Sequence, residues 1–205
     1  MSLDLTLLPS ELQKQMKGFA EEIPKAIQKA RDTVSGGGAG GKVTLWFGAS
    51  DKAAQIAIRD KLAKLRSYMM NQRIRCQLGN SRPANENALA EHVTGGLVGG
   101  GGFSSLQRVE ANLFGDSSVG VLNLSPNYGN LKTYATGPVS TFDGQDQFQT
   151  VIHELTHIVL GTGDEKLNNG NTAYTGLLAR QLATEDPDKA KNNAENWGLF
   201  IEEYR

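Results

Sequence analysis

The chain has 205 residues, 39% hydrophobic and 21% charged, an ordinary balance for a folded domain with a sizeable core. Its 21 Lys and Arg residues against 22 Asp and Glu residues leave no basic excess of the kind that binds nucleic acid, and no apolar run is long enough to form a transmembrane segment. The single cysteine, Cys76, excludes an intramolecular disulfide framework and is interpreted as a small buried hydrophobic residue.

The N-terminal part is predicted to be a helix followed by a linker. Apolar residues recur at three- and four-residue steps over residues 10–34, and Ser10 is a suitable N-cap. Residues 36–41 are all glycine except one alanine and are interpreted as a flexible linker. Residues 36–42 resemble a phosphate-binding loop, but Val43 stands where Ser or Thr is needed, and a strand-like run rather than a helix follows. Nucleotide binding is therefore not expected.

The next segment is predicted to alternate between strands and a helix. Residues 42–48 are rich in β-branched and aromatic side chains, which favours a strand. Ser50 or Asp51 is expected to cap a helix that ends near Gln72. A short strand is expected at residues 74–78.

The middle of the chain is predicted to be mainly loop. Residues 80–105 are polar and then rich in glycine, which indicates a long loop. Strand-like runs follow near residues 107–113 and 119–125. Residues 126–143 contain many turn residues.

The last third is predicted to be helical, with helices at residues 146–160, at about 172–183, and from Pro187 toward Tyr204. The predicted strands lie before residue 126 and the last third is helical, and this separation indicates an α+β fold with a small, mostly antiparallel sheet.

The strongest motif lies on the first of these helices. His153-Glu154-Leu155-Thr156-His157 matches the pattern HExxH. Residues four apart lie on one helical face, so both imidazoles can bind one zinc ion, while Glu154 can reach a water at the metal without binding the ion itself. Only three histidines exist in the chain, and apolar residues flank the motif on both sides. A zinc site, with one ion per chain, is therefore expected.

A third zinc ligand must come from elsewhere, because catalytic zinc usually has three protein ligands and one open position. Asp164 follows His157 by seven residues, after glycines that should end the helix and turn the chain back. The other candidates are His92, Glu165, Glu185 and Glu195.

The chain resembles the aspzincin family of deuterolysin and the peptidyl-Lys metalloendopeptidases. The resemblance covers residues 42–205, and HExxH followed by Gly161-Thr162-x-Asp164 is its most specific part. Three further segments are similar to the family: residues 45–48, 121–124 and 193–196. The resemblance implies a zincin-like catalytic domain over residues 42–205, preceded by the helical segment 1–35 and the linker 36–41.

The resemblance also implies roles for single residues. Asp164 would be the third zinc ligand. The family has a Tyr that stabilises the oxyanion shortly after this Asp, but Leu167 stands at that position here, and Tyr174 is the nearest candidate. Glu195 takes the position of an acid in the family's lysine pocket, and Gly198 replaces a second acid.

The predicted function is therefore zinc-dependent hydrolysis of peptide bonds in a protein or peptide substrate, with Glu154 as base and a preference for Lys on the C-terminal side of the scissile bond. The alternative is a catalytically weak or inactive zinc-binding module of a larger secreted effector. The family resemblance favours secretion or export. Residues 1–5 show no secretory signal, so a cytoplasmic location is also open.

Overall fold

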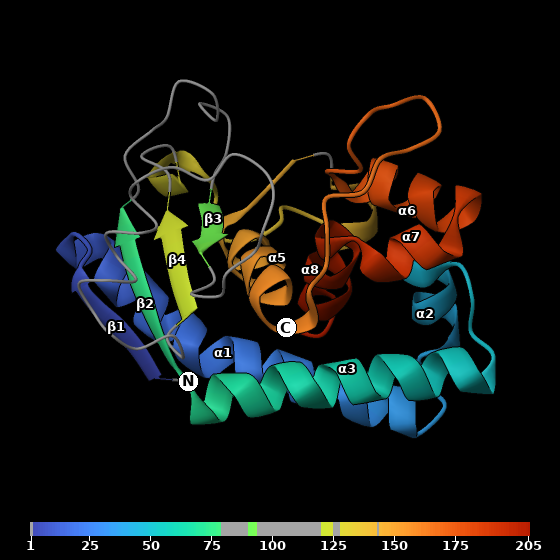
Figure 1. The fold of residues 1–205 in the computed structure, drawn as a ribbon, viewed down its shortest axis with the longest axis horizontal. Helices are drawn as coiled ribbons and strands as arrows, with labels where there is room; N and C mark the ends of the chain where they lie inside the picture. The colour runs from blue at the N-terminus through green and yellow to red at the C-terminus, as the bar shows by residue number, and fades with distance from the viewer. Residues whose placement is uncertain (1, 79–89, 94–119, 125–127, 143) are drawn as a thin grey trace, which may run out of the picture.

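The computed structural model describes residues 2–78, 90–93, 120–124, 128–142 and 144–205 (Figure 1). Its elements in chain order are β1 (Ser2–Leu7), α1 (Ser10–Ser35), α2 (Gly40–Phe47), α3 (Lys52–Asn71), β2 (Arg73–Leu78), β3 (Ala90–Val93), β4 (Gly120–Leu124), the 3-10 turns η2 (Tyr128–Asn130) and η3 (Val139–Thr141), α5 (Gln147–Leu160), α6 (Gly176–Glu185), α7 (Pro187–Asn192) and α8 (Ala194–Glu202). The predicted strand at 107–113 and most of the loop predicted at 80–105 lie outside the described residues.

The four described strands form one mixed sheet in the order β1-β2-β4-β3 (Figure 1). Strand β1 pairs with β2 and β2 with β4 in parallel, and only β3 runs antiparallel, beside β4. The expectation of a mostly antiparallel sheet was wrong. The strand at residues 2–7 was not predicted, and α1 to α3 connect it to β2 as a helical crossover, which makes the two strands parallel.

The strand predicted at residues 42–48 is also wrong, because these residues belong to helix α2. Its buried side chains are Val43, Trp46 and Phe47, which share one helical face at steps of three and four residues. Gly48 ends the helix in a left-handed conformation with φ of 70°. A Cβ atom there would collide with the carbonyl oxygen of Ala183, so packing also favours glycine at this position.

The glycine-rich residues 36–41 join two helices that share one core. Gly36 caps α1, a turn follows, and Gly40 begins α2. A helix therefore does follow the run that resembles a phosphate loop, although a helix also precedes it, where such a loop needs a strand. Buried side chains from Leu5 to Tyr204 belong to a single hydrophobic cluster, so the segment 1–35 packs into the same core as the C-terminal helices.

The helices predicted at residues 10–34 and from Ser50 or Asp51 to about Gln72 are confirmed as α1 and α3. The two helices pack against each other, and α3 runs along the lower edge of the molecule in Figure 1. Asp51 caps α3 by accepting a hydrogen bond from the Ala54 amide at 2.9 Å. Cys76 is fully buried, and burial raises the pKa of its thiol to about 12. Among the described helices none is both long and apolar enough to span a membrane.

Helix α5 lies at the centre of the molecule, between the sheet and α8 (Figure 1). Asp146 caps it, since its Oδ1 accepts a hydrogen bond from the Gln149 amide at 2.9 Å. Gly161 ends it with φ of 68°, and its amide donates to the carbonyl of His157 at 3.2 Å. Nearly every side chain along α5 is buried, so its polar residues depend on partners from other elements.

The helix predicted from Pro187 to Tyr204 is divided in two at Asn193. This residue has φ of −87° and ψ of 122°, an extended conformation that separates α7 from α8. Its side chain is fully buried, and its Nδ2 donates to the Ala173 carbonyl at 3.3 Å and to Asn196 Oδ1 at 2.6 Å. The break therefore exposes backbone groups of residues 192–194 to hydrogen bonding with the loop that follows α5.

Two buried carboxyl groups also meet where α5 begins and α8 ends. Burial raises the pKa of both Asp146 and Glu202, and the negative charge of Asp146 further raises the pKa of Glu202, which reaches about 8. Glu202 Oε1 accepts a hydrogen bond from the Ala135 amide at 3.2 Å. A carboxyl whose pKa is higher in the folded than in the unfolded protein binds more protons when folded. Its contribution to the free energy of unfolding therefore falls as pH rises from about 4.5 to about 8.

We expect Glu202→Gln to become progressively more stable relative to the wild type as pH rises through this window. The amide keeps the shape of the protonated acid and cannot ionise, so the variant should gain roughly 1–3 kcal/mol between pH 5 and pH 8.5. Denaturant unfolding of the zinc-loaded proteins at both pH values measures this. The control is Glu203→Gln, which removes an ion pair with Lys42 of 2.8 Å and should lack this trend. A flat difference for Glu202→Gln would contradict the prediction.

Candidate metal centre

Helix α5 brings the two imidazoles of the HExxH motif together. His153 and His157 are both buried, and their Nε2 atoms lie 3.1 Å apart. The rings are nearly perpendicular, with an interplanar angle of 80°. One helical turn separates the two residues, so the regular backbone of α5 places both nitrogens on the same side.

Asp164 reaches the same point from the loop after α5. Its Oδ1 lies 3.1 Å from His153 Nε2 and 3.3 Å from His157 Nε2. The loop is docked on the break between α7 and α8: the Gly163 amide donates to the Asn192 carbonyl at 2.8 Å, and the Ala194 amide donates to the Gly163 carbonyl at 2.9 Å. The α7–α8 break therefore fixes the residue before Asp164.

The three atoms fit a zinc ion in spacing and in chemistry. A tetrahedral ion binds its ligands at about 2.0–2.1 Å, which places them about 3.3–3.4 Å apart. The measured separations among His153 Nε2, His157 Nε2 and Asp164 Oδ1 are 3.1, 3.1 and 3.3 Å. Two imidazole nitrogens and one carboxylate oxygen are also a common ligand set for catalytic zinc.

The hydrogen bonds of the other ring nitrogens turn both Nε2 atoms toward this point. His157 Nδ1 lies 2.7 Å from the carbonyl oxygen of Thr162, which can only accept, so Nδ1 donates. His153 Nδ1 lies 3.1 Å from Glu195 Oε2 and likewise donates to an acceptor. In neutral imidazoles both Nε2 lone pairs then converge with a carboxylate oxygen. Such a group of electron pairs suits a bound cation.

The charges around His153 point the same way. Burial acts to lower its pKa, but hydrogen bonds to Asp164 and Glu195 outweigh burial and raise the pKa to about 10. Burial acts to raise the pKa of Asp164, and the two histidines hold it well below its usual range. The site therefore favours positive charge between these side chains.

Glu154 lines the site from a greater distance. Its Oε1 lies 3.9 Å from His153 Nε2, farther than Asp164 Oδ1 does, and its side chain is buried. One ligand atom from each of His153, Glu154 and His157 lies within 4.8 Å of the others. Glu154 is thus close enough to reach a small molecule at the metal, and Asp164 is better placed than Glu154 to bind the metal itself.

Tyr174 also reaches the site, because a closed loop shortens the path from Asp164. The Ala173 amide donates to the Glu165 carbonyl at 2.9 Å, so residues 166–172 form a loop whose two ends meet. The Tyr174 ring centroid lies 6.0 Å from that of His153. Burial, together with the charge of Asp164 and a hydrogen bond to it, raises the pKa of Tyr174, which keeps the hydroxyl protonated at neutral pH. Leu167, at the position expected for the family's tyrosine, is buried in a small cluster with α6 and α7.

Glu195, predicted to bind the substrate's lysine, is surrounded by protein hydrogen-bond donors. It is fully buried, and its carboxylate accepts hydrogen bonds from Gln149 Nε2 at 2.6 Å, from the Thr175 amide at 2.9 Å and from His153. Gly198 packs against α5, where an added Cβ would lie 3.0 Å from Gln149 Nε2. The role of Glu195 in binding substrate stays a prediction, and its oxygens contact protein groups and no solvent, which argues against that role.

Two of the remaining candidates for a third ligand, Glu165 and Glu185, have hydrogen-bond partners of their own. Glu165 Oε1 accepts a hydrogen bond from Asn192 Nδ2 at 2.6 Å, and Glu185 accepts from the Asn168 amide at 3.1 Å. His92 belongs to β3, where its backbone is paired with Leu122.

Comparison with known structures defines the fold as that of a zinc peptidase. The structure aligns with a zinc peptidase from Grifola frondosa with a TM-score of 0.62, covering 95% of this chain and 96% of that one at 20% sequence identity. Residues 118–202 match the aspzincin family model, described as lysine-specific metallo-endopeptidase. In fold, and in sequence over these residues, the chain is therefore similar to the aspzincin metallopeptidases.

Two curated relatives are named as proteases. An extracellular protease of Aeromonas hydrophila is 40% identical over 73 residues, which is 35% of this chain and 18% of that protein. A neutral protease 2 homologue of Aspergillus fumigatus is 28% identical over 191 residues, which is 88% of this chain and 52% of that protein. The chain thus spans about half the length of the second relative and less of the first.

Proposed function

We propose that this chain is a zinc-dependent metalloendopeptidase in which His153, His157 and Asp164 hold the ion. The observation that carries the proposal is the convergence of two Nε2 atoms and one carboxylate oxygen within 3.1–3.3 Å of one another. When bound, zinc supplies the Lewis acidity that activates water and polarises a peptide carbonyl.

The residues of the chain supply the proton transfers and the orientation. Glu154 accepts a proton from the attacking water and delivers it to the leaving amine, which requires a carboxylate close to the metal but outside its ligand set. Tyr174, kept protonated by its surroundings, donates a hydrogen bond to the developing oxyanion. The alternative of an inactive zinc-binding module was based on the missing family tyrosine, and the position of Tyr174 beside His153 weakens that basis.

The proposed substrates are proteins or peptides, because the relatives from Aeromonas hydrophila and Aspergillus fumigatus are named as proteases. Secretion is proposed because the first of these is named an extracellular protease. A preference for lysine is supported by the description of the family model. It would need an acidic group other than the buried Glu195 to receive the lysine side chain.

One experiment tests both the activity and the preference. We expect the zinc-loaded protein to cleave a complex peptide mixture, a chelator to abolish cleavage, and added zinc to restore it. Mass spectrometry of the products identifies the cleaved bonds. Enrichment of Lys directly after the scissile bond would support the lysine preference, and a frequency equal to that of the peptide pool would refute it. Absence of cleavage by a protein shown to contain zinc would refute the proposed activity.

A further inference from the structure

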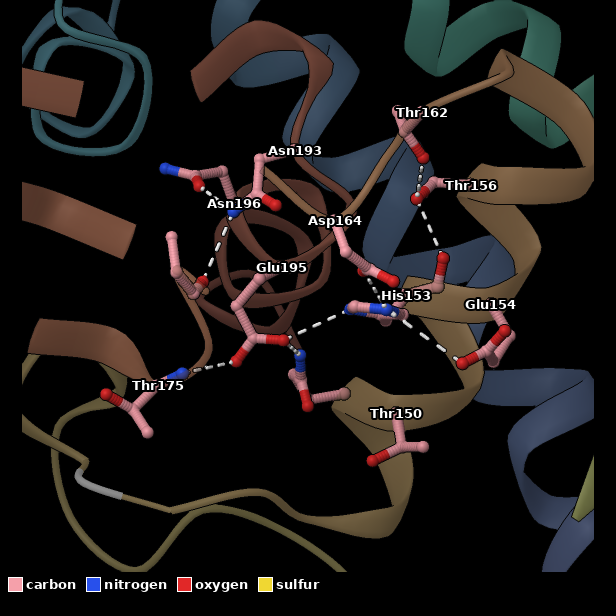
Figure 2. A network of polar contacts seen from close by, with 12 residues as sticks. Thr150, His153, Glu154, Thr156, Thr162, Asp164, Thr175, Asn193, Glu195 and Asn196 are labelled. Carbon is pink, nitrogen blue, oxygen red and sulfur yellow. Dashed lines mark hydrogen bonds and ion pairs between the residues drawn. The ribbon is translucent and has the colours of Figure 1, made fainter. Parts of the chain in front are cut away.

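Glu195 lies at the centre of a buried polar network that the HExxH motif alone does not predict. Figure 2 shows its carboxylate between His153 on α5 and Thr175, the residue before α6. One oxygen, Oε2, accepts from His153 Nδ1 at 3.1 Å and from Gln149 Nε2 at 2.6 Å, and the other, Oε1, accepts from the Thr175 amide at 2.9 Å. The side chain has no exposed surface.

We infer that Glu195 is a positioning residue of the proposed metal site, which holds His153 with Nε2 toward the ion and fixes the segment that carries Tyr174. The inference rests on the proposed function. A carboxylate can only accept, so its contact with His153 requires the ring proton on Nδ1 and leaves Nε2 to the metal. An outer carboxylate of this kind sets the tautomer and the ring orientation of a metal-binding histidine.

The same carboxylate holds the backbone next to Tyr174. Thr175 has φ of 83° and ψ of 154°, a positive-φ extended conformation that is unfavourable for a β-branched residue. Its amide is directed at Glu195 Oε1, and Gly176 follows with its amide donating to the Phe142 carbonyl at 3.2 Å. The hydrogen bond to Glu195 therefore stabilises a backbone turn that sets the direction of the preceding residue, Tyr174.

Glu195 is itself held rigidly. Asn196 Nδ2 donates to the Trp46 carbonyl at 2.6 Å and to the Ala179 carbonyl at 2.9 Å, which ties the start of α8 to α2 and α6. Asn193 Oδ1 accepts from the Glu165 amide at 3.0 Å, next to Asp164. The segment 193–196 thus contacts α5, the segment next to Asp164 and the residue after Tyr174. Figure 2 shows Glu195 between His153 and Thr175.

The test compares zinc affinity in three proteins: the wild type, Glu195→Gln, and the matched control Glu202→Gln. The control makes the same substitution on the same helix, at a residue that is also buried but has no contact with the histidines. We expect chelator competition to show zinc binding about 10–100-fold weaker in Glu195→Gln. The control should stay within about 2-fold of the wild type, and unfolding curves report that each variant is folded.

A second measurement does not depend on any variant. Long-range proton–nitrogen NMR of the zinc-loaded wild type should show the His153 proton on Nδ1, with zinc on Nε2. In Glu195→Gln the exchange of that proton with water should become faster. A wild-type His153 that binds zinc through Nδ1 would overturn the inference even if the variant does not fold.

The outcomes separate this inference from the proposed function. A wild-type protein that binds no zinc refutes the proposed function. A wild type that binds zinc and cleaves peptides, with Glu195→Gln equal to it in zinc affinity, refutes only the positioning role. Loss of lysine preference in Glu195→Gln at unchanged zinc affinity would also overturn it, and would restore Glu195 to the substrate pocket.

Discussion

Glu154→Gln is expected to lower kcat by a factor of about 10²–10⁴ while zinc binding and stability stay close to those of the wild type. The amide has the shape of the carboxylate but cannot accept a proton at neutral pH. Glu154 Oε1 lies 3.9 Å from His153 Nε2, whereas Asp164 lies closer to both histidines, so its replacement should leave the three proposed ligands in place.

The measurement is steady-state cleavage of a fluorogenic peptide at saturating zinc, combined with metal analysis. Glu185→Gln is the control, because this glutamate on the surface of α6 bonds to the Asn168 amide and not to the site. Activity of Glu154→Gln near that of the wild type would show that another group acts as the base. Loss of zinc together with activity would show instead that Glu154 is a ligand.

His157→Ala and Asp164→Ala are each expected to weaken zinc binding by more than about 100-fold, since loss of an outer partner alone costs about 10–100-fold. Each removes one of three atoms that lie 3.1–3.3 Å apart, and each leaves the remaining ligands without a complete site. Glu185→Ala removes a carboxylate of the same C-terminal region and should keep zinc.

Zinc analysis after gentle purification, followed by thermal unfolding with and without added zinc, measures this effect. A ligand that binds only the folded state at 100 times its dissociation constant adds about 2.7 kcal/mol of stability. The wild type and Glu185→Ala should show that gain, and the two ligand variants should not. If Asp164→Ala retains zinc while Glu185→Ala loses it, the ligand assignment is wrong.

The features that the sequence predicted correctly are those set by local periodicity. Helices α3 and α5 have apolar residues at helical spacing and directly follow Asp51 and Asp146, whose carboxylates cap them. The HExxH spacing depends only on the helical repeat, and for that reason the geometry of His153 and His157 follows directly from the sequence.

The features that were missed depend on contacts between distant segments. Residues 42–48 have strand-forming side chains, yet burial of Val43, Trp46 and Phe47 on one face stabilises α2 instead. Parallel pairing of β1 with β2 joins residues about seventy positions apart, and no local pattern encodes it.

The hydrogen-bond partners of Glu195 were missed for a similar reason. Its neighbours in α8 are almost all buried, and a carboxylate in such a helix needs hydrogen-bond donors from the protein itself. The buried pattern of α8 can be predicted from the sequence. The residues that donate to Glu195, His153 and Thr175, cannot, because they come from two other segments.

Because of the closed loop at residues 166–172, Asp164 and Tyr174 are far apart along the chain but are held near each other in space. Because Ala173 bonds back to Glu165, this stretch leaves and re-enters the structure at one place, and Gly170 with φ of 87° lies within the turn that reverses it. Residues could be added at the exposed turn near Gly170, beyond the buried Leu167, while the bond between Ala173 and Glu165 keeps Asp164 and Tyr174 in place. The number of residues between a metal-binding aspartate and a following tyrosine is therefore a poor criterion for recognising relatives of this protein, and the backbone closure between Glu165 and Ala173 is a better one.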